Sequence, residues 1–320
     1  MKHTFQKIAF LFPGQGAQYI GMGGDFAQNF SAARLTFEEA DQLLERPLSH
    51  IISQGPADLL TETKNSQAGI YVTSMSIFRV IKELYEITPF VCAGLSLGEY
   101  SALTGAEILS FRDALPLVQL RGQWMNEACE QTNGGMAVIM GLDAEVVQQF
   151  VKELQLPNDL WVANYNCPGQ VVISGTEKGI AAGTEAAKKH MAKRVLPLQV
   201  HGAFHSGLMS TAREKLAPFI EKAAFLQGSS QLVMNVPGDF VKDLSSIRYN
   251  LINQVTHSVK WEQGIRAMER EGVDLYIEFG PGKTLSGMNK RIGVQAPNIS
   301  IEKVEDLKHL ESILHNKPHS

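Results

Sequence analysis

The chain has 320 residues, of which 44% are hydrophobic and 19% are charged, and 29 basic against 33 acidic side chains leave a formal net charge of −4. This composition is typical of a globular protein with a substantial core and excludes a disordered chain. It also argues against a nucleic-acid-binding protein, because no Lys/Arg block is long enough to follow a phosphate backbone. Since the length exceeds what one core usually serves, we expect a large domain and a small one.

Neither a membrane span nor a disulfide framework is expected. The N-terminal apolar run over 8–12 stops at Pro13-Gly14, which makes it too short for a signal sequence or a bilayer helix. The cysteines, Cys92, Cys129 and Cys167, are far apart and odd in number, which suits neither disulfides nor a zinc site. We therefore expect a cytoplasmic protein that does not associate with membranes.

The first part of the chain predicts alternating strands and helices. An apolar strand over 8–12 runs into the glycine loop 13–18, and a long helical pattern lies within 56–86. A second short strand, over 90–93, meets Gly94 and turns at once into another helical pattern. Such a strand–turn–helix unit is where a parallel sheet presents a reactive residue.

The middle of the chain predicts a smaller module. Its pattern indicates strand 136–142, helix 144–154, strands 160–165 and 171–174, helix 176–191 and strand 195–200. The order βαββαβ is that of a ferredoxin-like module. We expect this segment, 129–200, to be inserted into a larger α/β subdomain made of 1–128 and 201–320. That subdomain includes a strand over 275–279 and an amphipathic segment over 307–314.

The strongest local signal is a G-x-S-x-G pattern between a predicted strand and a predicted helix, Gly94-Leu95-Ser96-Leu97-Gly98. A serine in this context sits on a tight turn with its hydroxyl exposed, and the two glycines let the backbone bend. The next backbone N–H and the helix N-terminus can stabilise an oxyanion. A purely structural glycine turn is the alternative, and the context favours a nucleophile.

A serine nucleophile needs a base, for which nine histidines compete. Most of them lie near the termini or in polar surroundings, which leaves His201 and His205. His205 stands in Gly202-Ala203-Phe204-His205-Ser206, between a predicted strand end and a helix start. The residues themselves favour His205 only slightly over His201.

Seven spaced motifs follow one another along the chain: Phe12-Pro13-Gly14-Gln15-Gly16-Ala17-Gln18, Gly94-Leu95-Ser96-Leu97-Gly98-Glu99-Tyr100, Arg121-Gly122 with Met125, Asn166-Cys167-Pro168-Gly169-Gln170, Gly202-Ala203-Phe204-His205-Ser206, Gln254, and Glu278-Phe279-Gly280-Pro281-Gly282. Their order resembles that of the malonyl-CoA:acyl-carrier-protein transacylases and of the related acyltransferase domains of fatty-acid and polyketide synthases. The match runs from about Phe10 to Arg291. It implies an α/β-hydrolase-like large subdomain that carries an inserted ferredoxin-like small subdomain.

The resemblance implies a role for each matching residue. Ser96 resembles the nucleophile and His205 the general base, in a Ser–His dyad whose base is oriented through main-chain carbonyls near Gln254. A carbonyl that accepts the Nδ1–H fixes the tautomer without a third carboxylate. The backbone N–H groups of Gln15 and Leu97 resemble the oxyanion hole.

Three further residues bear on the substrate. Arg121 resembles the arginine that pairs with the free carboxylate of malonyl, since a guanidinium matches a carboxylate bidentately; an arginine on a helix surface is the alternative. Phe204 resembles the malonyl-selecting form, which leaves no space for an α-methyl branch and discriminates by ~1–3 kcal/mol. Leu95 departs from the histidine that most of the family has there, which puts fine extender-unit selectivity in doubt. Cys167 also departs, and we interpret it as a structural thiol.

Together these residues predict a ping-pong transfer of malonyl from malonyl-CoA to the phosphopantetheine thiol of an acyl carrier protein. We expect no metal, no tightly bound cofactor and a monomeric enzyme. The alternatives are an acyl hydrolase that unloads carrier proteins, which Arg121 argues against, a non-catalytic carrier-docking module, and a lipase-type esterase with an acid among Asp113, Asp143 and Asp159. Fatty-acid and polyketide synthesis share these motifs, and Leu95 slightly favours a trans-acting polyketide enzyme.

Overall fold

The computed structural model describes residues 5–198, 200 and 202–315. It forms two compact units, the first made of Met1–Gly122, Ala224–Val233 and Met268–Ser320, and the second of Gln123–Ala223 and Met234–Ala267. Helices α7 (Phe111–Gln131) and α12 (Trp261–Arg270) each contain a boundary between the units. The second unit includes the 129–200 segment together with residues on both sides of it.

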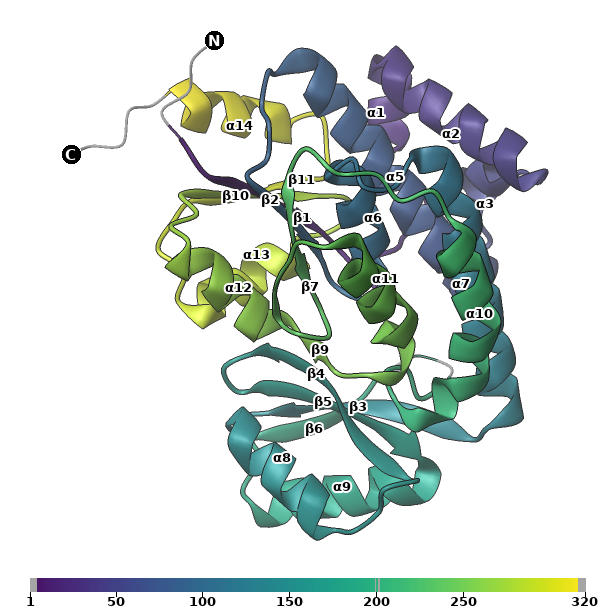
Figure 1. Ribbon diagram of the computed structural model, residues 1–320, viewed down its shortest axis with the longest axis vertical. Helices are drawn as coiled ribbons and strands as arrows, with labels where there is room; N and C mark the ends of the chain where they lie inside the picture. The colour runs from purple at the N-terminus through teal and green to yellow at the C-terminus, as the bar shows by residue number, and fades with distance from the viewer. Residues whose placement is uncertain (1–4, 199, 201, 316–320) are drawn as a thin grey trace. The chain divides into compact units, whose positions relative to one another are not determined.

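The first unit is built on a parallel sheet with the strand order β11-β10-β1-β2-β7. These strands are β1 (Ile8–Phe12), β2 (Val91–Gly94), β7 (Gln231–Met234), β10 (Leu275–Phe279) and β11 (Asn298–Ile301). All five residues of β1 are buried, because β1 lies between β10 and β2 and both faces of a parallel sheet are covered. Figure 1 shows this N-terminal strand, in purple, beside the C-terminal strands. The predicted strands 8–12 and 275–279 are confirmed, and 90–93 shifts by one residue.

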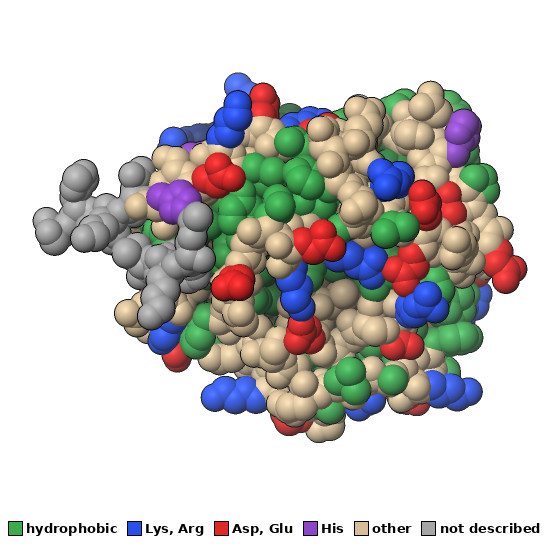
Figure 2. Space-filling model, turned by 90° about the horizontal axis from the view of Figure 1, so that it is seen from above, with side chains coloured by type: hydrophobic (Ala, Val, Ile, Leu, Met, Phe, Trp, Pro, Cys, Tyr) green, Lys and Arg blue, Asp and Glu red, His purple; other side chains and the backbone are tan. Residues whose placement is uncertain are grey.

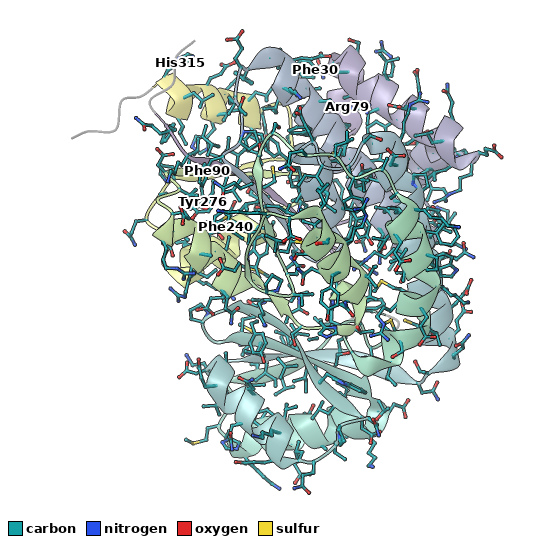
Figure 3. The ribbon with its side chains drawn as sticks, viewed as in Figure 1. Phe30, Arg79, Phe90, Phe240, Tyr276 and His315 are labelled. Atoms are coloured by element: carbon teal, nitrogen blue, oxygen red, sulfur yellow. The ribbon has the colours of Figure 1, made fainter. Side chains whose placement is uncertain are left out.

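Four helices contact the strands of this sheet: α5 (Thr63–Leu84), α6 (Gly98–Gly105), α13 (Thr284–Ile292) and α14 (Asp306–His315). Four other helices pack against α5: α1 (Gly24–Asn29), α2 (Ser31–Leu44), α3 (Leu48–Gln54) and α4 (Ala57–Thr61). The long helix α5 is buried over most of its length. Its Arg79, labelled in Figure 3, donates to Glu39 of α2 at 2.8 Å and lies 4.4 Å from the ring centre of Phe111 in α7. This side chain therefore joins three helices of the first unit.

The glutamate of the Glu278-Phe279-Gly280-Pro281-Gly282 motif anchors the loop after β10. The buried Glu278 carboxylate accepts the N–H groups of Leu285 and Ser286 at 3.0 and 2.9 Å, in the first turn of α13. Gly280 has φ +136°, and a Cβ on it would lie 2.8 Å from Cγ of Pro13. The loop after β10 thus packs directly against the loop after β1.

The second unit contains an antiparallel sheet extended by one parallel strand, in the order β6-β3-β5-β4-β9. The elements of the second unit are β3 (Gly134–Met140), α8 (Ala144–Glu153), β4 (Leu160–Cys167), β5 (Gln170–Thr176), α9 (Glu177–Lys189), β6 (Arg194–Pro197), η1 (Gly207–Met209), α10 (Ser210–Lys222), β8 (Asp239–Val241), α11 (Leu244–Asn253), η2 (Gln254–Thr256) and β9 (Val259–Lys260). Helices α8 and α9 lie on one face of the sheet (Figure 1).

The predicted βαββαβ order of the second unit is confirmed from β3 to β6. The strand order of these four, with the first and last strands adjacent and the third beside the first, is that of a ferredoxin-like module. The strand predicted over 195–200 lies at Arg194–Pro197, and the N–H of the next residue, Leu198, still donates to the carbonyl of Met136 in β3 at 2.9 Å.

Among residues 5–198, 200 and 202–315, no helix is both long enough and apolar enough to cross a bilayer. On the face shown in Figure 2, acidic and basic side chains are interspersed with apolar ones. This face carries the mixed charge that the near-neutral total of −4 predicts.

Candidate active site

Ser96 lies on a strained turn between β2 and α6. Its φ of +53° is left-handed, a conformation that costs a non-glycine residue energy and that persists only where neighbours impose it. A Cβ on Gly94 would lie 1.9 Å from the carbonyl of Gly98, and a Cβ on Gly98 would lie 2.1 Å from the carbonyl oxygen of Phe12. Only glycine fits at both positions, so the G-x-S-x-G pattern is required by close backbone contacts.

The two backbone amides predicted to form an oxyanion hole come from loops that touch each other. Leu97 is the residue before α6, and Gln15 stands in the loop after β1. A Cβ on Gly14 would lie 2.4 Å from the carbonyl oxygen of Leu95, so this glycine lets the loop of Gln15 approach the Ser96 turn. The first unit therefore brings the Gln15 loop and the Leu95–Leu97 turn together.

Arg121 of α7 is buried beside the serine. Its side chain is 1% exposed, so the alternative of an arginine on a helix surface is wrong. Its Nη2 donates to Oγ of Ser96 at 3.0 Å, and its guanidinium lies 5.8 Å from the ring centre of Tyr100. Burial lowers the pKa of Arg121, against the raising effect of Glu99, yet a guanidinium remains charged at neutral pH. A buried cation thus points at the hydroxyl of Ser96.

Gln67 of α5 is a residue of this site that no sequence motif identified. Its Oε1 accepts Nη1 of Arg121 at 2.6 Å, and its Nε2 donates to Oε1 of Gln15 at 3.2 Å. The sequence offered only a compositional signal: α5 begins with polar residues although its later positions are mostly apolar. The structure buries Thr63, Asn65, Ser66 and Gln67 among them. Such buried polar groups are hydrogen-bonded, so they indicate a network.

His205 lies in the second unit and is also left-handed, with φ +57°. It is 4% exposed, and its Nδ1 lies 2.9 Å from the main-chain oxygen of Gln254, at the start of η2. Because a carbonyl oxygen can only accept, Nδ1 carries the proton and Nε2 is the basic nitrogen. The predicted contact between His205 and Gln254 is present, and it runs through the backbone of Gln254.

The other residues predicted around this base lie in the same unit or cannot be placed. Phe204 is buried in an apolar cluster that includes Met125 and Val255. His205 itself lines a cavity of about 510 Å³, together with Trp161. The competing histidine, His201, lies outside the described residues.

The aspartates considered for a hydrolase-type triad have other positions. Asp113 accepts Oγ of Ser110 at 2.5 Å at the start of α7, Asp143 precedes α8, and Asp159 accepts Oγ1 of Thr176 at 2.8 Å. Because Nδ1 of His205 is bonded to a main-chain oxygen, none of the three is its orienting partner.

The described residues hold no cluster of three or more His, Cys, Asp or Glu side chains that could bind a metal ion. None of the three cysteines forms a disulfide. Cys167 is buried, and its Sγ lies 3.7 Å from Oε1 of Gln170. Burial raises the pKa of Cys129 to about 12, which keeps that thiol protonated at neutral pH.

Comparison with known proteins connects these features to a family. Residues 9–299 match the family model of the acyl transferase domain. The chain is 44% identical to a malonyl CoA-acyl carrier protein transacylase of Bacillus subtilis, covering 94% of this chain and 95% of that one. It is 36% identical to the transacylase of the same name from Haemophilus influenzae, covering 97% and 99%.

Solved structures show the same fold. One is described as a type II PKS acyl-carrier protein in complex with its malonyl-transacylase; its TM-score is 0.92 at 36% identity, covering 98% of this chain and all of that chain. A malonyl CoA-acyl carrier protein transacylase from Coxiella burnetii gives a TM-score of 0.94 at 31% identity, covering 99% and 100%. The predicted α/β fold class and the predicted resemblance are thereby confirmed. The chain belongs to the acyl transferase family, among the malonyl-CoA:acyl-carrier-protein transacylases.

Proposed function

We propose that this protein transfers a malonyl group from malonyl-CoA to the phosphopantetheine thiol of an acyl carrier protein, through a malonyl ester on Ser96. The observation that carries the proposal is the buried guanidinium of Arg121, which donates to Oγ of Ser96 at 3.0 Å. A fixed cation beside the nucleophile suits an acyl group that ends in a carboxylate. The names of the relatives point to the same reaction.

In the first half-reaction, Nε2 of His205 takes the proton of Ser96 while Oγ attacks the thioester carbonyl. The amides of Gln15 and Leu97 stabilise the resulting oxyanion. The C–S bond then breaks, and the departing sulfur takes the proton from His205, which leaves CoA and malonyl-Ser96. The main-chain oxygen of Gln254 keeps the tautomer of His205 in the form that this step needs.

In the second half-reaction, the carrier thiol gives its proton to His205 and attacks the ester carbonyl. The ester C–O bond breaks, Ser96 takes the proton back, and malonyl leaves as the carrier thioester. Arg121 binds the malonyl carboxylate in both halves, which favours malonyl over acetyl and holds the ester in one position. No tightly bound cofactor enters this scheme.

Selectivity beyond the carboxylate is assigned to Phe204 and Leu95. The ring of Phe204 is proposed to exclude an α-methyl branch, and Leu95 adds an apolar side chain without hydrogen-bonding groups next to the nucleophile. We also propose that 129–200 is the ferredoxin-like insert and that the enzyme acts as a monomer. The proposed location of the reaction is the cytoplasm.

Radiolabelled malonyl-CoA tests the reaction. The wild type should retain label after denaturation and Ser96→Ala should retain none, because the ester cannot form. Ser76→Ala is the matched control, since Ser76 is a buried serine of the same unit that donates to Thr73 at 2.8 Å. Equal labelling of the wild type and Ser96→Ala would refute the nucleophile.

Adding carrier protein to the labelled wild type identifies the second half-reaction. Label should move to the carrier, whereas release of free malonate would indicate the hydrolase. Competition between a fatty-acid carrier and a polyketide carrier then assigns the pathway.

A further inference from the structure

We infer that Gln67 is a positioning residue that sets the preference for malonyl, because its side-chain amide connects the carboxylate-binding arginine to the loop of the oxyanion hole. The inference rests on the proposed function and adds to it a residue outside the seven sequence motifs. Gln67 lies in the second turn of α5 and is completely buried.

The orientation of Arg121 depends on Gln67. A guanidinium is planar, and its N–H groups form a rigid fork. Oε1 of Gln67 accepts Nη1 at 2.6 Å, while Nη2 donates to Oγ of Ser96 at 3.0 Å. Fixing Nη1 therefore fixes the direction of Nη2, the group that faces the nucleophile.

The Gln67 amide is itself held in one orientation. A charged donor requires the amide oxygen, so Nε2 is turned to the opposite side, where it donates to Oε1 of Gln15 at 3.2 Å. Nε2 of Gln15 in turn lies 3.5 Å from Oγ1 of Thr63, a long contact. The amide of Gln67 thus links the cation to the residue whose backbone N–H is proposed to bind the thioester oxygen.

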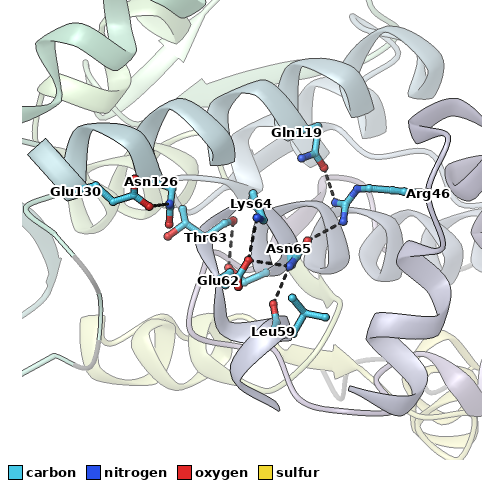
Figure 4. Close-up of polar contacts among 10 residues, drawn as sticks. Arg46, Leu59, Glu62, Thr63, Lys64, Asn65, Gln119, Asn126 and Glu130 are labelled. Atoms are coloured by element: carbon cyan, nitrogen blue, oxygen red, sulfur yellow. Dashed lines mark hydrogen bonds and ion pairs between the residues drawn. The ribbon is translucent and has the colours of Figure 1, made fainter. Parts of the chain in front are cut away.

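The two helices that carry Gln67 and Arg121, α5 and α7, are joined by Arg46. Arg46 donates to Oδ1 of Asn65 at 2.7 Å and to Oε1 of Gln119, as Figure 4 shows. Asn65 lies two residues before Gln67 in α5, and Gln119 lies two residues before Arg121 in α7. This arginine therefore joins α5 to α7 in the turns that carry Gln67 and Arg121.

The backbones of α5 and α7 also approach closely at this level. A Cβ on Gly122, the residue after Arg121, would lie 2.7 Å from Cα of Lys64. The close approach and the Arg46 contacts hold the helices so that a side chain of glutamine length spans the distance between Arg121 and Gln15. The position of the guanidinium is therefore built into the packing of the first unit.

A purely structural role for Gln67 makes a different prediction from a positioning role. If Gln67 only satisfied buried polar groups, its loss would loosen the site for every ligand. If it aims Arg121, its loss should weaken ligands that have a carboxylate and spare those that do not. Malonyl-CoA and free CoA are such a pair, because the product CoA lacks the whole acyl group.

The experiment uses Gln67→Met, which keeps the length of the side chain and removes both hydrogen bonds, and Gln67→Glu, which places a negative charge against Arg121. For both variants we expect kcat/KM for malonyl-CoA to fall about 10- to 100-fold, mainly through KM, as expected for a lost charge-assisted hydrogen bond. The inhibition constant of free CoA should stay within about twofold of the wild type. Gln67→Glu should show the larger rise in KM, since its carboxylate competes with malonyl.

Ser76→Ala is the matched control, because Ser76 is a buried serine of the same helix whose Oγ donates to the carbonyl of Thr73 at 2.8 Å, outside this network. Its KM should be that of the wild type. An equal loss for malonyl-CoA and free CoA, or no change in KM, would overturn the inference while leaving the proposed function in place. Failure of the wild type itself to form malonyl-Ser96 would instead overturn the proposed function.

Discussion

The turns that carry Ser96 and His205 reach the same unusual backbone conformation by different means. Both residues are left-handed, with φ of +53° and +57°. The Ser96 turn depends on missing side chains, since Gly94 and Gly98 leave no space for a Cβ. The His205 turn depends on polar bonds that are present: Oγ of Ser206 donates to the carbonyl of Ala203 at 2.6 Å and accepts the N–H of Leu208 at 3.2 Å.

This difference separates two ways of holding a strained residue. Backbone packing against a sheet cannot relax without moving β1 and β2, so a strained turn of that kind is rigid. The hydroxyl and imidazole bonds of the His205 turn each make a modest contribution, and Gly202 before it is also crowded, since a Cβ there would lie 1.9 Å from Sγ of Cys129. We therefore expect the first turn to be sensitive to added atoms and the second to be sensitive to removed ones.

The largest effect is expected from adding a single methyl group to the Ser96 turn. In Gly94→Ala the new Cβ would lie 1.9 Å from the backbone of Gly98, which cannot shift cheaply. We expect the free energy of unfolding to fall by about 3 kcal/mol or more. Chemical denaturation followed by circular dichroism measures it.

Gly287→Ala provides the control for this prediction. Gly287 lies in α13, and a Cβ there meets nothing within 4 Å. Alanine is the better helix former, so this variant should gain up to about 1 kcal/mol. If the two glycine variants had equal stability, the account of the Ser96 turn would be wrong.

A smaller effect is expected from removing the hydroxyl of the second turn. Ser206→Ala leaves the carbonyl of Ala203 and the N–H of Leu208 without this partner, which should cost about 1–2 kcal/mol. Differential scanning calorimetry gives the change in stability. Ser210→Ala is the comparison, because its hydroxyl makes a similar 2.6 Å bond to Gly207 in a solvated position and should cost less than about 0.5 kcal/mol. Equal costs would contradict the importance of burial at Ser206.

The smallest effect on catalysis is expected at Gln254. Because the carbonyl of Gln254 orients His205, Gln254→Ala retains the contact that matters. We expect kcat/KM to stay within about tenfold of the wild type, measured below the unfolding transition, whereas mispositioning a catalytic histidine costs about 10,000-fold. A loss as large as that of His205→Ala would show that the side chain of Gln254 acts directly.

Much of the first unit's architecture could be predicted from short stretches of sequence. The apolar runs that form β1 and β10 are continuous, and a buried parallel strand needs no information beyond such a run and its length. The βαββαβ order of the second unit could be predicted as well, since strands and helices differ in the period of their apolar residues. The bounds were less accurate than the order: the strand predicted over 136–142 lies at Gly134–Met140, and the strand predicted over 195–200 lies at Arg194–Pro197.

The candidate site was predictable where its residues are neighbours in the chain. The turn of Ser96 is coded by glycines within two positions of it, and the family motifs identify Arg121, His205 and Gln254 one by one. Gln67 could not be predicted in this way, because it lies in no short motif and its partners, Gln15 and Arg121, are 52 and 54 residues away in the chain.

The sequence by itself therefore determined the family, the order of the elements and the turn that strains Ser96, because each depends on residues close together along the chain. The tertiary structure alone decided that Arg121 is buried with its charge on the serine, that a backbone oxygen orients His205, and that Gln67 joins Arg121 to Gln15. These contacts depend on how α5 packs against α7 and on which loops meet above the sheet. Packing of that kind is set by the shapes of distant segments, and no local pattern in the sequence encodes it.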